Sequence, residues 1–143
     1  MRLWPLAILD QLPRQQLLGQ HRECCALRGK GWGRKHATVD YVFKHPHSWL
    51  FGYHVRVMNE MSRRGFTHEV LWSCVSYRGK TLGFDKSLIT DYSKNERYLM
   101  VGNGRIFPEH DESYLGECIA NLAAKGIAID REKALGNMKI MKE

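Results

Sequence analysis

The residues best suited to covalent chemistry lie near the start of the chain, where Met1-Arg2 is followed by His21-Arg22-Glu23. An α-amino group has a reference pKa of about 7.7–8.0, so a useful fraction of it is an unprotonated nucleophile near neutral pH. A carboxylate such as Glu23 can stabilise a developing cation and then move protons. Guanidinium grips phosphate through two parallel hydrogen bonds, which makes Arg2 and Arg22 candidate phosphate clamps. Together these groups indicate amine-based chemistry on an anionic substrate.

A first helix is expected to position Glu23. Pro13 suits a first helical turn, and Gly29 suits a C-cap. With 3.6 residues per turn, one apolar face and one polar face are predicted. The apolar face holds Leu17, Leu18, His21 and Cys25, and the polar face holds Gln15, Gln16, Gly19, Arg22 and Glu23. Because Gly19 has no side chain, a ligand can approach the polar face there.

A basic, glycine-rich segment follows this helix directly. It spans residues 28–36 and supplies the predicted DNA contacts, which are Arg28, Lys30, Trp32, Arg34, Lys35 and His36. Its cations attract phosphate, and its glycines let the backbone come close to a phosphate. Trp32 can stack on a base or wedge into a duplex. The alternative interpretation is a solvated turn with Trp32 packed on the core. A net charge of +7 also favours an anionic partner.

The order of these motifs resembles the pyrimidine-dimer DNA glycosylase family of the phage endonuclease V type. The shared order is an amino-terminal basic residue, Arg-Glu on a first helix, Arg-Lys-His at 34–36 and Arg-Gly-Phe at 64–66. The resemblance covers residues 1 to about 66. It implies a DNA glycosylase with associated AP lyase activity on double-stranded DNA, working without a cofactor through a Schiff base. The nucleophile would be the α-amine of Met1, and the essential acid would be Glu23.

The whole chain is expected to form one all-α domain of 143 residues with three principal helices. An extended N-terminal arm would be buried and so hold the terminal amine in place. The second helix is predicted over 45–65, and the third helix is predicted around 114–123. Residues 66–108 are predicted to be rich in loops and turns, with room for one short helix or a pair of strands. Asp111 can start the third helix and Gly126 can stop it, and a short helix is predicted over 130–135.

The remaining features favour a cytoplasmic enzyme with no obligate protein partner. No segment approaches the roughly 20 consecutive apolar residues that a membrane span needs. The four cysteines show no CxxC spacing, which favours buried thiols over a disulfide framework.

Two other functions stay open at this stage. The first is a non-catalytic nucleic-acid-binding module that keeps the helices and the basic segment. The second is a metal-dependent hydrolase, since His21 and Cys25 have an i, i+4 spacing that can hold zinc. Because no second pair of ligands is evident, we predict no metal and interpret His21 as a core residue.

Overall fold

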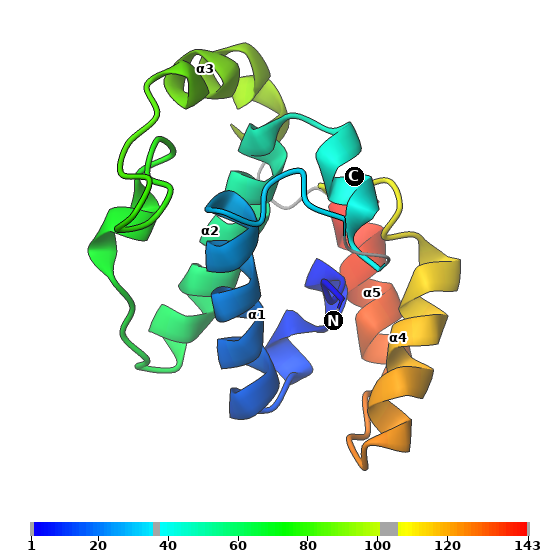
Figure 1. The fold of residues 1–143 in the computed structure, drawn as a ribbon. Coiled ribbons are helices and arrows are strands. Elements are labelled where there is room, and N and C mark those ends of the chain that lie inside the picture. The colour runs from blue at the N-terminus through cyan, green and yellow to red at the C-terminus, as the bar shows by residue number, and fades with distance from the viewer. Residues whose placement is uncertain (1, 36–37, 101–105, 143) are drawn as a thin grey trace.

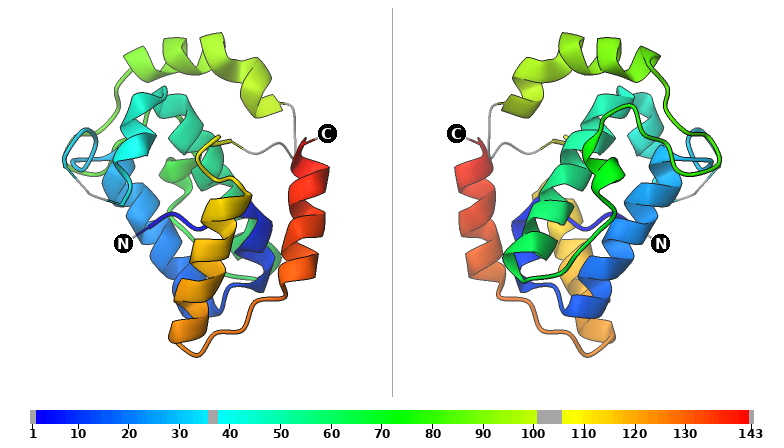
Figure 2. Two further views of the ribbon diagram at one scale, coloured as in Figure 1. Left: turned by 90° about the vertical axis from the view of Figure 1, so that its right-hand side faces the viewer. Right: turned by 90° about the vertical axis from the view of Figure 1, so that its left-hand side faces the viewer.

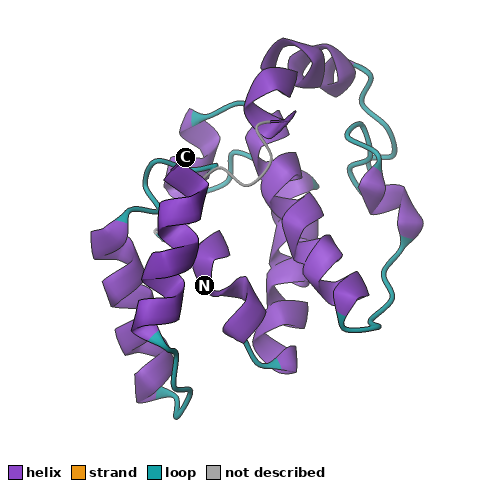
Figure 3. Cartoon of the chain, turned by 180° about the vertical axis from the view of Figure 1, so that it is seen from behind, coloured by secondary structure: helices purple, strands orange, loops and turns teal. Residues whose placement is uncertain are grey.

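The computed structural model describes residues 2–35, 38–100 and 106–142, and over these residues the chain is all-α, as predicted. The described part contains one isolated β-bridge, between Tyr77 and Phe84, and no β-strand (Figure 3). Its five α-helices are α1 (Arg14–Arg28), α2 (His47–Arg63), α3 (Ser87–Met100), α4 (Glu112–Ala124) and α5 (Arg131–Lys142). Three short 3-10 helices are η1 (Leu6–Gln11), η2 (Asp40–Lys44) and η3 (Val70–Ser73).

Helices α1 and α2 pack side by side and form one half of the core (Figure 1). Leu50, Val57 and Met61 recur along α2 at helical spacing and are fully or almost fully buried. They meet Leu17 and Leu27 of α1 in a single hydrophobic cluster. Burial of these faces, at about 25 cal/mol per Å² of apolar surface, is the main force that holds the two helices together.

The N-terminal arm enters this core, as predicted. Residues 2–5 are not helical, and Leu3 and Trp4 are buried. The arm then turns into η1, whose Ala7, Ile8 and Leu9 are also buried. Since η1 packs against both α2 and α5, it joins the α1–α2 pair to the C-terminal helix α5 (Figure 2). Residues 3–9 are therefore held by the core on both sides.

The region predicted to be rich in loops contains α3, a helix of 14 residues, where one short helix or a pair of strands was expected. The helix crosses over the beginning of α2 (Figure 1). Two contacts attach it there: the Asp91 carboxylate accepts a 3.0 Å hydrogen bond from the Ser48 backbone N–H, and the Tyr92 ring meets Phe51 edge-on. A carboxylate at a helix N-terminus satisfies a free N–H and is favoured by the helix dipole.

The last two helices agree better with the sequence. Asp111 caps α4 by accepting a 2.8 Å hydrogen bond from the Tyr114 N–H, and Gly126 ends the helix region with φ of +81°. Helix α5 begins as predicted but runs on to Lys142 instead of ending near Leu135. In the described residues, no helix is both long and apolar enough to cross a membrane.

Candidate active site

The N-terminal arm is held at its backbone by the side chain of Gln20, which is 2 % exposed. The Gln20 Nε2 donates to the Arg2 carbonyl over 2.9 Å, and its Oε1 accepts from the Trp4 N–H over 2.9 Å. The Tyr53 hydroxyl lies 2.5 Å from the Trp4 carbonyl and 2.7 Å from the same Oε1. One buried amide thus spans two residues of the arm, and a tyrosine from α2 fixes that amide.

A second tyrosine holds the arm from the side of α4. The Tyr114 hydroxyl donates to the Leu3 carbonyl over 2.8 Å. Its ring lies 5.9 Å from the Arg2 guanidinium, within range of a cation–π contact. We call Gln20, Tyr53 and Tyr114 the arm clamp. Because the clamp engages the backbone of residues 2 to 4, it limits where the preceding α-amine can lie.

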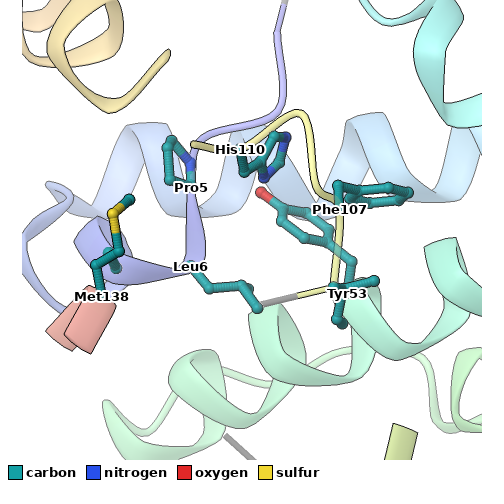
Figure 4. A pocket seen from close by; sticks show the side chains of 8 residues that line it. Pro5, Leu6, Tyr53, Phe107, His110 and Met138 are labelled. Atoms are coloured by element: carbon teal, nitrogen blue, oxygen red, sulfur yellow. The ribbon is translucent and has the colours of Figure 1, made fainter. Parts of the chain in front are cut away.

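Beneath the arm, the packing leaves almost no space. Figure 4 shows Tyr53 and His110 close to Pro5, with Phe107 beside them. The cavity that they line has a volume of about 10 Å³, which is room for at most one water molecule. A substrate therefore cannot enter from this side, and the arm has little freedom to sink further into the core.

On the other side of the arm lies an open pocket of about 260 Å³. Helix α1 contributes its polar face, where Gly19 leaves the backbone uncovered, and α4 contributes Asn121 and Lys125. The Lys125 ammonium lies 5.6 Å from the Trp4 ring, and the buried Oδ1 of Asn121 has no partner in the described part of the chain. The full lining is Arg2, Trp4, Gln16, Gly19, Gln20, Thr38, Asn121 and Lys125.

Glu23 lies on the same face of α1 as this pocket, one turn after Gly19 and Gln20, and is half-buried. Arg22 beside it is exposed, and Arg2 at the pocket is half-buried. Met1 lies outside the described residues. The geometry therefore brings together Arg2, the polar face of α1 and Glu23, at the end of a clamped arm.

Arg28 does not belong to this site, and its predicted contact with DNA is wrong. The side chain is completely buried and donates to the carbonyls of Trp72 (2.7 Å) and Cys74 (2.8 Å). A further contact of 2.8 Å joins its Nη1 to Nδ1 of His54. Burial lowers the pKa of Arg28 to about 10, so it stays charged near neutral pH. Its role is to hold the segment after α2 against α1.

The helical periodicity of α1 is enough to predict that Arg28 is buried. Arg28 is three residues after Cys25 and seven after His21, which places it on the apolar face of the helix. The charge pattern alone grouped it with the basic segment.

The rest of the basic segment divides into packed and exposed residues. The Trp32 ring lies 5.0 Å from Phe43 and 4.5 Å from His47, measured between ring centroids, and it packs against the core. This placement agrees with the alternative interpretation of a packed tryptophan. Gly31 also serves packing here, because a Cβ at this position would come within 2.8 Å of the Ala26 carbonyl oxygen. Three cations of the segment are exposed, namely Lys30, Arg34 and Lys35, while His36 lies outside the described residues.

A cluster of nitrogen and sulfur donors lies on the opposite face of α1. His21, Cys25 and His54 bring one possible ligand atom each within 4.8 Å of the others. The sequence suggested the first two and did not identify His54 as a third possible ligand. His54 could be found only once α2 was known to pack on α1 at this level.

Comparison with known protein families gives a match to the N-terminal half of the chain. A family model described as pyrimidine dimer DNA glycosylase matches residues 1–73 of the 143-residue chain. The match therefore includes the arm, α1, the basic segment, α2 and η3. Neither the curated proteins nor the solved structures provide a match.

Proposed function

This chain belongs to the pyrimidine dimer DNA glycosylase family, and from that premise we propose that it excises damaged pyrimidines and then nicks the DNA backbone. The nucleophile in this proposal is the α-amine of Met1, and Glu23 is the acid-base residue. The observation that carries the proposal is the arm clamp, which fixes residues 2 to 4 beside an open pocket on the Glu23 face of α1.

In the first step, the unprotonated amine attacks C1′ of the damaged nucleotide. A bond forms between nitrogen and C1′, the glycosidic bond breaks, and the base leaves with its bonding electrons and takes up a proton. The sugar ring then opens as the C1′–O4′ bond breaks and O4′ takes up a proton, which leaves an iminium ion between C1′ and the nitrogen. A carboxylate at Glu23 stabilises the positive charge that develops at C1′ and on the nitrogen.

In the second step, a base removes a proton from C2′ and the C3′–O bond breaks, which releases the 3′ phosphate and cuts the strand. Glu23 is suited to this proton transfer because it lies on the pocket face of α1. Water then hydrolyses the imine and regenerates the amine. No step requires a cofactor.

The duplex must be deformed for this chemistry, since C1′ is not accessible within stacked B-DNA. A pocket of about 260 Å³ beside the arm offers space for a nucleotide turned out of the stack. Arg2 and Arg22 are proposed to hold the flanking phosphates, with Lys30, Arg34, Lys35 and His36 adding attraction that weakens as salt increases.

The test is borohydride trapping on duplex DNA that carries a pyrimidine dimer. Borohydride reduces the iminium to a stable amine, so the wild-type chain should become covalently attached to the DNA. Glu23→Gln should prevent nicking, whereas the matched variant Glu132→Gln, at an exposed position of α5, should behave as wild type. An added N-terminal tag should abolish both trapping and nicking, while DNA affinity is largely retained.

A wild-type protein that binds DNA without trapping or nicking would reject this mechanism. It would instead support a non-catalytic nucleic-acid-binding module, in which Glu23→Gln leaves binding unchanged or improves it.

A further inference from the structure

We infer that His21, Cys25 and His54 form a binding site for a zinc-class divalent metal ion between α1 and α2. The site lies on the face of α1 opposite the Glu23 pocket, so the inference is independent of the proposed DNA chemistry.

The three donor atoms already have the spacing of ligands around one ion. His21 Nδ1 lies 2.8 Å from His54 Nε2, and the Cys25 sulfur lies 4.0 Å from each of these nitrogens. For tetrahedral zinc, with metal–nitrogen bonds of about 2.0–2.1 Å and metal–sulfur bonds of about 2.3 Å, the corresponding separations are about 3.3 and 3.6 Å. Each side of the triangle therefore needs to change by only about half an ångström.

The backbone elements hold these ligands rigidly. His21 and Cys25 lie one turn apart on α1, and His54 extends from the middle of α2, which packs along α1. The His68 ring, from the segment after α2, has its centroid 5.9 Å from that of His21 and can close the site with a fourth nitrogen. An ion bound here would join α1, α2 and that segment.

The protonation states of the two histidines suit coordination, whereas the cysteine must lose its proton. Burial lowers the pKa of both His21 and His54, so both imidazoles are neutral near pH 7 and have a lone pair to donate. Burial raises the pKa of the Cys25 thiol to about 11, so the metal-free protein carries S–H there. Metal binding replaces this S–H bond with a sulfur–metal bond and releases one proton to solvent.

Arg28 sets the metal-free arrangement. Its guanidinium donates to His54 Nδ1, so the ring proton is on Nε2 and points to His21. Coordination by Nε2 moves that proton to Nδ1, and Arg28 gives up this one contact while its bonds to the carbonyls of Trp72 and Cys74 remain. The Cys25 thiolate offsets the nearby guanidinium charge. A site with two imidazoles and one thiolate selects zinc-like ions over magnesium or calcium.

The experiment uses the full-length chain, treated with chelator and then titrated with Co²⁺ as a spectroscopic probe. We expect one ion per chain and a thiolate-to-cobalt absorption band that Zn²⁺ abolishes by competition. Cys25→Ser should remove the band, and Cys74→Ser, at an exposed cysteine outside the cluster, should keep it. Absence of the band in the wild type, or its persistence in Cys25→Ser, would overturn the inference.

A second variant guards against misfolding of Cys25→Ser. His21→Gln changes a half-buried residue and should weaken Zn²⁺ binding at least about tenfold, while its helical circular dichroism stays that of the wild type. At one zinc concentration, the melting temperature of the wild type should rise by more than that of His21→Gln. An equal rise in both proteins would show that the ion binds elsewhere.

Discussion

The substitution Gln20→Leu tests whether the arm clamp both stabilises the fold and positions the reactive amine. It removes the two hydrogen bonds to the arm and the one to Tyr53. The Trp4 N–H is left buried without an acceptor, which costs about 1–3 kcal/mol, and the half-buried Arg2 carbonyl adds a smaller term. Tyr53 keeps its bond to the Trp4 carbonyl. We therefore expect the free energy of unfolding to fall by about 2–3 kcal/mol, measured by urea denaturation.

The expected loss of activity is larger than this loss of stability. A domain with about 5–15 kcal/mol of stability remains almost entirely folded after such a change. A displacement of the amine by about 1 Å, however, costs on the order of 100-fold in rate. Single-turnover borohydride trapping on a duplex with an abasic site measures this directly, because iminium formation there requires the amine but not base excision.

The matched control is Gln15→Leu, an exposed position on the same helix. It should leave both stability and trapping close to wild type. If Gln20→Leu were trapped as fast as this control, the clamp would not position the amine. If the free energy of unfolding of Gln20→Leu also matched that of the control, the hydrogen bonds to the arm would make no net contribution to the stability of the fold.

Three further outcomes are expected. Arg28→Met should lower the free energy of unfolding by about 3 kcal/mol, since the carbonyls of Trp72 and Cys74 lose a charged donor. Urea denaturation that shows no loss of stability would contradict this. Arg34→Gln should instead leave the free energy of unfolding unchanged. If Arg34 contacts a phosphate, the variant should also make the slope of log K for DNA binding against log salt less steep by about 0.9. An unchanged slope in the DNA-binding titration would remove Arg34 from the interface. Burial lowers the pKa of His47 from 6.5 to about 4. As the pH drops, the unfolded chain therefore takes up a proton on this residue before the folded chain does. The free energy of unfolding should fall by up to about 3 kcal/mol between pH 6.5 and about 4. His47→Gln should show a shallower fall across that pH range in parallel urea titrations, and an equal fall would assign the effect to other groups.

The elements that the sequence predicted well are those with strong local signals. Helices α1 and α4 have a proline or aspartate at the start and a glycine at or just after the end, and both lie where expected. The burial of the N-terminal arm was also predictable, because Leu3 and Trp4 are apolar and precede a helix with an apolar face. Such features depend on neighbours in sequence, which a single chain displays.

The features that were missed depend on contacts between distant segments. Helix α3 was hidden because the glycines around it suggested loops, and its anchor is the contact of Asp91 with Ser48 of another helix. Arg28 was interpreted as a surface cation from its charge alone. Its place on the apolar face of α1 indicates burial, but its partners are backbone carbonyls some 45 residues further along, which have no sequence signature. Gln20 was placed on neither face of its helix, and only the path of the arm reveals its role.

The pocket is lined by residues from both the matched and the unmatched part of the chain, and this division suggests which part selects the DNA lesion. The family match ends at residue 73, yet Asn121, Lys125 and the Tyr114 hydroxyl that holds the arm all come from α4. The proposed nucleophile and Glu23 thus come from the matched half, whereas one wall of the pocket comes from outside it. A nucleotide that enters the pocket would meet both walls at once. Selectivity among lesions is therefore expected to vary with α4, and the covalent chemistry with the arm and α1.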